Sequence, residues 1–277
     1  MNAWTETVRE APAVTARTFT CTFGYYTDTL WTDRRSLTWA EFVPILTQHE
    51  VGPKEGTCIV PATFTDKRRH KKDAARIDLA VLDSDAGFTL QEIQTAIAKQ
   101  GWAAIISSTH SHLTNWTRVG RGNWDKFCLS ATDMGRAPAD FLLDKGYLTR
   151  VVEGARVVGT TDESVVIEHQ PCPKFRIVIP LLRPWLAASY DNQRTANETW
   201  KERIEALAAE LHLDHDQACT DTSRLFYLPR RSADGPPPET AVLEGEACDL
   251  FSLPAAPRPE PAERRRARAS KPGQRSA

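Results

Sequence analysis

Apolar residues recur with the spacing of strands and helices between residues 18 and 254, which predicts one folded body of mixed α+β class. Short apolar runs bounded by polar turns predict strands at 58–64, 77–82, 102–107, 174–181 and 225–229. Helical spacing of apolar residues predicts helices at 39–48, after Thr89, at 138–145 and around Trp200.

The clearest unit is the strand–helix–strand stretch at 77–107. Thr89 and Glu92 have the spacing of a capping box, which predicts the start of the helix, and Gly101 predicts its end. Two strands joined by such a crossover run parallel, and parallel strands end at one edge of a sheet, where ligands bind. We therefore expect the polar residues that follow the two strands to meet there: Asp83, Asp85, Ser108, His110 and His112.

Asp83 and Asp85 are the most informative pair, because residues two apart in a strand project to the same face. Two carboxylates held side by side repel each other unless a cation neutralises them. Mg²⁺ and Mn²⁺ prefer carboxylate oxygens. The pair therefore predicts half of a divalent-metal site, although two surface aspartates that merely end a strand would give the same pattern.

Charged residues mark two later strands. Lys174 and Arg176 share one face of the strand at 174–181, as either a solvated face or a cationic wall for phosphates. Asp216 follows the helix around Trp200, and Arg224 precedes the strand at 225–229, which we expect to pair within the same sheet. The alternative for Arg224 is a structural bridge to Asp221 or Asp214.

Two further stretches combine positive charge with a loop-like composition. The first is a basic loop at 67–72, and the second is a Gly/Asn-containing loop after His112 that carries tryptophans and arginines. Phosphate contacts and base stacking are the interactions by which such residues bind single strands. The candidate template-binding residues are Lys67, Arg68, Arg69, Lys71, Lys72, Trp116, Arg118 and Arg121.

Composition restricts the class of protein. The hydrophobic share of 41% and the charged share of 26% are ordinary for a soluble globular protein. The chain has no apolar run of roughly 18 residues and no signal-peptide layout at its start, which predicts a cytoplasmic protein without membrane partners. The six cysteines form no C-x-x-C pair, which argues against a zinc ribbon or a disulfide framework.

The two ends of the chain differ from the body. Residues 1–17 are expected to be an N-terminal extension, and 18–254 the folded domain. Residues 255–277 carry seven basic and two acidic residues among many prolines and alanines, which predicts a disordered tail. Such a tail is either a solvated linker or a basic arm that touches nucleic acid.

The ordered combination of these motifs resembles the archaeo-eukaryotic primase superfamily, and within it the primase-polymerase domains of phage and plasmid replication proteins. That family has Asp-x-Asp, then Ser-x-His, then an Asp ahead of an Arg-containing strand. The residues that match are Asp83 with Asp85, Ser108 with His110, and Asp216 with Arg224, over about 77–231.

The resemblance implies an RRM-like catalytic sheet with flanking helices and a smaller N-terminal α/β part. It implies a DNA primase or DNA polymerase that uses NTP or dNTP on a single-stranded DNA template, with a replicative helicase as a further partner. Asp83, Asp85 and Asp216 would hold two Mg²⁺ or Mn²⁺ ions, which lie about 3.5–4 Å apart in such sites. The nucleotide-binding residues would be Ser108, His110, His112, Lys174, Arg176 and Arg224.

Two other classes of protein remain open. One is a metal-dependent phosphohydrolase of the haloacid-dehalogenase type with Asp83 as nucleophile, although Gly87 and Phe88 intervene where that family places a Thr. The other is a non-catalytic replication protein that binds single-stranded nucleic acid.

Overall fold

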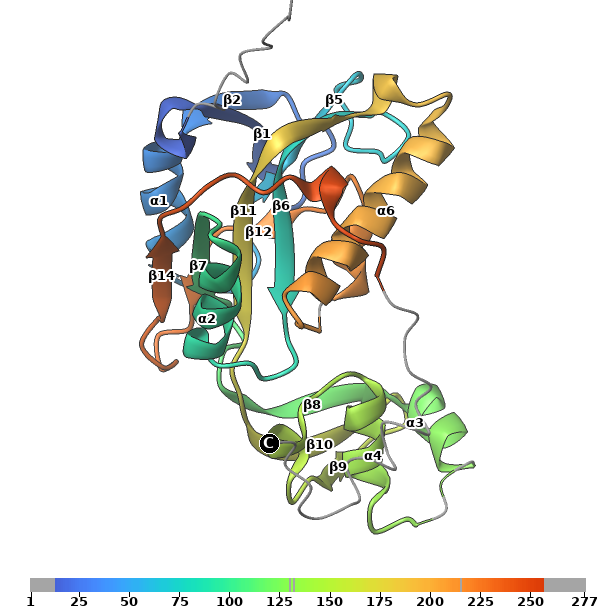
Figure 1. Ribbon diagram of the computed structural model, residues 1–277. Coiled ribbons are helices and arrows are strands. Elements are labelled where there is room, and N and C mark those ends of the chain that lie inside the picture. The colour runs from blue at the N-terminus through green and yellow to red at the C-terminus, as the bar shows by residue number, and fades with distance from the viewer. Residues whose placement is uncertain (1–12, 130, 132, 215, 257–277) are drawn as a thin grey trace, which may run out of the picture.

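A five-stranded sheet in the order β14-β7-β11-β6-β5 forms the centre of the larger body in the computed structural model, which describes residues 13–129, 131, 133–214 and 216–256 (Figure 1). Its strands are β5 (Ala62–Phe64), β6 (Ala74–Ser84), β7 (Ala104–Ser108), β11 (Phe175–Leu186) and β14 (Thr240–Leu243). Strand β11 pairs antiparallel with both β6 and β7. Strands β6 and β7 are therefore parallel, as predicted, but β11 lies between them.

Helices cover both faces of this sheet. Helices α2 (Leu90–Gln100) and α6 (Gln193–Glu210) pack on one face, where Ile93 and Ile204 are fully buried. Helix α1 (Trp39–Thr47) packs on the other face through Phe42. Both predicted capping boxes are formed, at Thr38 for α1 and at Thr89 for α2. Helix α2 ends as predicted at Gly101, whose φ of 71° favours glycine.

A second sheet, in the order β12-β4-β1-β2, lies against the α1 face. Its strands are β1 (Thr18–Tyr25), β2 (Asp33–Thr38), β4 (Thr57–Val60) and β12 (Phe226–Tyr227). The predicted strand at 58–64 is thus divided between two sheets, because Pro61 interrupts the strand between β4 and β5. The strand after Arg224 was predicted to join the catalytic sheet, and this was wrong: β12 pairs with β4.

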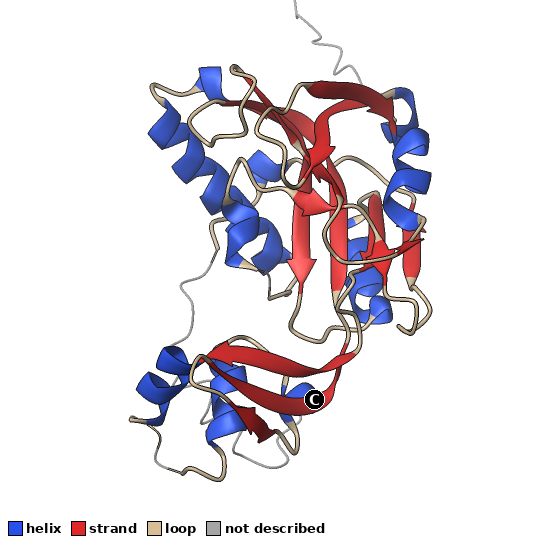
Figure 2. Cartoon of the chain, turned by 180° about the vertical axis from the view of Figure 1, so that it is seen from behind, coloured by secondary structure: helices blue, strands red, loops and turns tan. Residues whose placement is uncertain are grey.

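Residues between β7 and β11 form a separate small lobe below the larger body (Figures 1 and 2). It contains the sheet β8-β10-β9 and three helices: β8 (Thr114–Gly120), α3 (Arg121–Cys128), α4 (Ala137–Asp144), α5 (Thr149–Val152), β9 (Arg156–Thr160) and β10 (Ser164–Cys172). Its own core includes Phe141, Leu142 and Ile167. The prediction of a loop around Trp116 was wrong, since Trp116 lies within β8.

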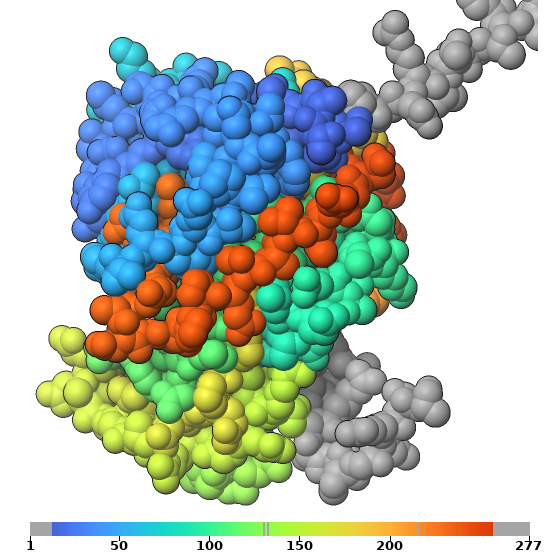
Figure 3. Space-filling model, turned by 90° about the vertical axis from the view of Figure 1, so that its left-hand side faces the viewer, coloured from blue at the N-terminus to red at the C-terminus, as the bar shows by residue number. Residues whose placement is uncertain are grey.

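The C-terminal part of the described chain runs across the surface between the N-terminal part and the region of α2 (Figure 3). A short parallel pair, β3 (Glu50–Val51) with β13 (Arg230–Arg231), joins a segment near the start of the chain to one near its end. The predicted tail lies outside the described residues from 257 on, as do residues 1–12 of the predicted extension. None of the helices in the described ranges has the length and apolar character needed to cross a membrane.

Candidate active site

Three facing residues mark the edge where the central strands end. Arg176 on β11 lies opposite Asp83 on β6 and opposite Ser107 on β7. The guanidinium of Arg176 holds both carboxylate oxygens of Asp83, with Nε–Oδ1 at 2.7 Å and Nη2–Oδ2 at 3.0 Å. Both side chains are largely buried, at 15% and 11% exposed. Asp83 therefore has its counter-charge within the protein.

Asp216 reaches the same edge from the connection after α6. Its backbone N–H donates to the Asp83 carbonyl at 3.0 Å, which fixes the two main chains side by side. Asp216 Oδ1 accepts from the Ala218 N–H at 3.0 Å and Oδ2 accepts from Arg224 at 3.2 Å. Arg224 thus bridges to Asp216, and to neither of the two acids considered as alternatives.

Asp85, Asp214 and Asp216 line one acidic hollow of about 230 Å³. Burial raises the pKa of Asp85, and the charges of Asp83 and Asp216 raise it further, while Lys174 acts in the opposite direction. The other walls include Lys145 and Tyr147 from the small lobe. The hollow therefore concentrates negative charge that the surrounding protein neutralises only in part.

A divalent cation fits the chemistry of this hollow, since carboxylate oxygens are the donors that Mg²⁺ and Mn²⁺ prefer. Across the described ranges, however, no three His, Cys, Asp or Glu side chains are arranged as a group that could hold a metal ion. The reason lies in the pairing: Asp83 is engaged by Arg176, and Asp216 by Ala218 and Arg224. Of Asp83, Asp85 and Asp216, Asp85 is the one whose carboxylate is in no ion pair with a described residue, and the nearby charge of Lys174 compensates it in part.

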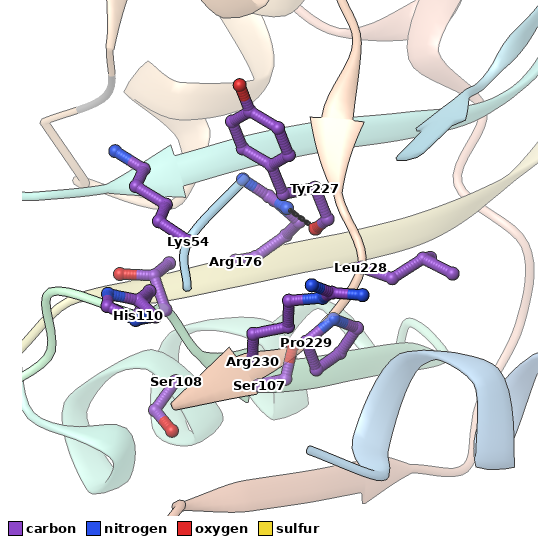
Figure 4. A pocket seen from close by; sticks show the side chains of 10 residues that line it. Lys54, Ser107, Ser108, His110, Arg176, Tyr227, Leu228, Pro229 and Arg230 are labelled. Atoms are coloured by element: carbon purple, nitrogen blue, oxygen red, sulfur yellow. Dashed lines mark hydrogen bonds between the residues drawn. The ribbon is translucent and has the colours of Figure 1, made fainter. Parts of the chain in front are cut away.

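A basic cleft lies on the other side of Arg176 (Figure 4). It is lined by Lys54, Ser107, Ser108, Thr109, His110, Arg176, Tyr227, Leu228, Pro229 and Arg230. Figure 4 shows Lys54 and His110 on one side and Arg230 with Pro229 on the other. Of its three cations, Arg176 is paired with Asp83 and Arg230 with Glu50, so an anionic ligand would share these two and meet Lys54 directly.

Ser108 and His110 are anchored at the end of β7. The Ser108 hydroxyl accepts from the Glu239 N–H at 3.1 Å, and the Ser108 carbonyl lies 2.8 Å from His49 Nε2. His110 Nε2 lies 3.1 Å from the Gly52 carbonyl. Ser108 and His110 both line the cleft, as do Lys54 and Arg230, which no sequence motif indicated.

The Arg230 side chain packs against position 56, where glycine has no Cβ to obstruct it. Its guanidinium lies on Gly56, where an added Cβ would come within 2.4 Å of Arg230 Cζ. Arg230 also donates to Glu50 at 2.9 Å and to the Glu55 carbonyl at 3.1 Å. The strand pair β3–β13 and the glycine thus fix this cation at the wall of the cleft.

His112 takes a buried position beside the cleft. Its Nδ1 accepts from the Lys174 backbone N–H at 3.1 Å, which leaves the proton on Nε2 to donate to Glu239 at 3.2 Å. The ring also meets Phe175 edge-on, with centroids 4.8 Å apart. These contacts tie the end of β7 to the start of β11, while the predicted contact with a nucleotide stays a prediction.

Lys174 connects the acidic hollow to the small lobe. Its ammonium lies over the Tyr147 ring, 5.8 Å from the centroid, and the negative charge of Asp85 helps to raise its pKa. The Tyr147 hydroxyl lies 3.0 Å from Thr117 Oγ1, which in turn lies 3.0 Å from His169 Nε2. The lobe is also docked by Arg150, which donates to Glu92 of α2 at 2.8 Å. The lobe therefore contributes directly to the surroundings of the acids.

The predicted template-binding residues fall into two groups on separate surfaces. In the basic loop, Lys67, Arg68, Lys71 and Lys72 are exposed, whereas Arg69 is half-buried and donates to the Ser223 carbonyl at 2.6 Å. On the lobe, Trp116 is 50% exposed and Arg118 lies two residues along the same face of β8. Arg121 is paired with Asp125 at 2.8 Å.

No protein-family model, no curated protein sequence and no solved structure matches this chain.

Proposed function

We propose that the chain is a template-directed nucleotidyltransferase, a DNA primase or DNA polymerase of the primase-polymerase type. The proposal rests on two sites of opposite charge that adjoin at Arg176. The acids Asp83, Asp85 and Asp216 lie on one side of it, and a cationic cleft with Ser108 lies on the other. Nucleotidyl transfer needs this combination, because metal ligands and a triphosphate site must adjoin.

The arrangement of the central strands supports the RRM-like part of the proposal. Strands β6 and β7 are parallel and are separated by β11, with α2 and α6 on one face of the sheet. This is the order expected of a split β-α-β unit. The sheet β12-β4-β1-β2 with α1 then corresponds to the smaller N-terminal α/β part.

The basic cleft would take the triphosphate of the incoming nucleotide. Lys54, Arg176 and Arg230 would offset its charge, and Ser108 and His110 would bond its oxygens. Arg176 already spans both sites through Asp83, so it would keep that carboxylate oriented while facing the phosphates. Arg224 would hold Asp216 in the same way.

Asp85 and Asp216, with Asp83, would hold the divalent ions after a shift of these carboxylates toward one another, because among the described residues they do not form a metal-holding group as they stand. Bound there, such ions supply activation of the attacking 3′-hydroxyl and stabilisation of the leaving pyrophosphate. The chain's own residues prepare the place: burial and neighbouring acids concentrate charge at Asp85, and Lys174 limits the repulsion. The open face of β8, with Trp116 and Arg118, is where we place the single-stranded template.

One contact argues against the phosphohydrolase alternative. Attack by Asp83 on a phosphate ester would compete with Arg176, because both of its oxygens accept a charge-assisted hydrogen bond from that guanidinium, which lowers their nucleophilicity. A ligand or charge-balancing role suits this carboxylate better than attack on a phosphate ester.

The test is incorporation of labelled nucleotides on a homopolymeric single-stranded template with Mn²⁺ or Mg²⁺. The proposal predicts product that contains only the nucleotide complementary to the template, with no product when a chelator is added. Phosphate release from small esters without any incorporation would contradict it, and so would salt-sensitive strand binding without either reaction. The comparison is run with NTPs and with dNTPs, which also decides between primer and DNA synthesis.

A further inference from the structure

Three tyrosine rings form a chain of contacts that starts at Tyr227 in the wall of the basic cleft. Tyr25 ends β1 and Tyr26 follows it in the turn, and their ring centroids are 5.0 Å apart. Tyr26 in turn lies 6.2 Å from Tyr227 of β12. Tyr25 is 46% and Tyr26 40% exposed, although both lie beside well-packed strands. Single exposed aromatic residues need no explanation, but a contiguous group beside a cleft indicates a binding surface.

Main-chain pairing fixes these rings around strand β4. The Tyr26 N–H donates to the Gly56 carbonyl at 3.1 Å, and Tyr227 pairs with Cys58 two residues further along. Tyr26 is therefore bonded to the residue on which the Arg230 guanidinium rests, and Tyr227 pairs two residues further along the same segment. The backbones of Tyr26 and Tyr227 and the guanidinium of Arg230 therefore all contact β4 or the residue just before it.

The Tyr227 ring also belongs to the cleft itself. It shares the lining with Lys54, Arg176 and Arg230, and in Figure 4 it points away from Ser108. Burial raises the pKa of its hydroxyl, so the ring stays neutral at physiological pH. Phosphates in the cleft would thus have an uncharged aromatic surface at their outer end.

We propose that Tyr26 and Tyr227 form a stacking platform for the base of the nucleoside triphosphate whose phosphates occupy the basic cleft. The inference rests on the proposed function, because it takes the cleft to be the triphosphate site. Every base has a π-face, so a platform of this kind holds any nucleotide and leaves the choice among the four to the template. Cations on one side and rings on the other match the two chemical halves of a nucleotide.

The test compares a nucleoside triphosphate with inorganic triphosphate, each titrated calorimetrically in Mg²⁺ without template. Base–aromatic stacking of the usual strength makes the nucleotide bind roughly 5- to 150-fold tighter than the inorganic ion. Tyr26→Ala should remove most of this ratio and leave the affinity for inorganic triphosphate unchanged. Tyr227→Phe should keep the ratio, which shows that the ring and not its hydroxyl is required.

Leu186→Ala is the matched control, since it removes an exposed apolar side chain at the end of β11 that lies away from Arg176. It should leave the affinity of both triphosphates unchanged. Equal affinity of wild-type protein for the two ligands would overturn the platform while leaving the triphosphate site standing. Binding of neither ligand would reject the site and the platform together.

Single-stranded DNA is the competing occupant. If Tyr26→Ala weakened binding of an oligonucleotide and left the nucleotide-to-triphosphate ratio unchanged, the rings would belong to a strand path. That result would also overturn the inference. The folded state of each variant is checked by its thermal midpoint, and Tyr26 is the preferred position because it is the more exposed of the two rings.

Discussion

Arg176 holds Asp83 through two parallel hydrogen bonds, Nε–Oδ1 at 2.7 Å and Nη2–Oδ2 at 3.0 Å, across neighbouring strands of the central sheet. Because only Asp83 forms this ion pair, the two aspartates of the Asp-x-Asp motif have different surroundings. Asp83 is neutralised within the protein, whereas Asp85 faces a hollow shared with Asp216. Substitutions at the two positions should therefore have opposite effects on the metal-free protein.

The first prediction concerns the buried ion pair. Arg176→Met should lower the free energy of unfolding by about 3–5 kcal/mol, because it leaves the Asp83 carboxylate buried without a partner. Combining it with Asp83→Asn should recover part of that loss, since the uncompensated charge is then gone. Urea denaturation of the two single variants and the double variant measures this coupling, and strictly additive losses would show that the pair is energetically unimportant.

The second prediction concerns Asp85. Burial and neighbouring acids raise its pKa, so its charge opposes folding when no cation is present. Asp85→Asn should raise the free energy of unfolding in chelator by about 0.5–2 kcal/mol, the range usual for a stabilising change. Addition of Mn²⁺ should raise the thermal midpoint of the wild-type protein and have little effect on the variant. An equal shift in both proteins would remove Asp85 from the metal site.

The third prediction uses the glycine beneath Arg230. A Cβ at position 56 would come within 2.4 Å of the guanidinium carbon, so Gly56→Ala should displace Arg230 from the wall of the cleft. Affinity for inorganic triphosphate should fall about as much as in Arg230→Met, by roughly tenfold for one charge-assisted bond. Gly122→Ala is the matched control, because no atom lies near its added Cβ. Unchanged affinity in Gly56→Ala would place the phosphates elsewhere.

The fourth prediction concerns the docking of the small lobe. Arg150, together with the hydrogen bonds from Thr89, lowers the pKa of Glu92 from an ordinary value of 4.5 to about 2. Because the folded-state pKa is depressed, the pair stabilises the protein above about pH 4.5 and this contribution is lost as pH falls toward 2. Glu92→Gln should therefore lose stability at pH 7 and show a flatter decline between pH 5 and 3.

Glu198→Gln provides the control for that experiment, because Glu198 pairs with Arg194 within α6 and does not join two parts of the molecule. Its pH dependence should follow that of the wild-type protein. A Glu92→Gln curve parallel to the wild-type curve would show that the contact adds nothing to stability.

Local patterns were sufficient to predict the part of the site that depends on strand ends. Leu79 to Leu82 is a continuous apolar run that follows Ile77 and Asp78, and a buried strand of that kind must place Asp83 and Ser108 at the same edge once a helix connects it to the next strand. The capping residues Thr38 and Thr89 were predictable for the same reason, since each motif spans four residues.

Long-range pairing was not predictable in this way. Strand β11 inserts between β6 and β7 and pairs one of its edges with each of them, a choice that no local pattern contains. Lys54 and Arg230 reach the cleft only through the short pair β3–β13, whose strands have two residues each. Trp116 was expected in a loop because glycine and asparagine surround it, yet Val119 on the same stretch packs into the core of the lobe and makes it a strand.

The most direct test of the central claim is template-dependent incorporation by the wild-type protein, by Asp85→Asn and by Asp162→Asn, an exposed acid in the turn between β9 and β10. All three proteins are assayed with the same single-stranded template, labelled nucleotides and Mn²⁺, under single-turnover conditions. The account predicts extended product from the wild-type protein and from Asp162→Asn, and a loss of at least about 100-fold in Asp85→Asn, as expected when a transition-state charge loses its stabilisation. Full incorporation by Asp85→Asn, with its fold verified by denaturation, would contradict it.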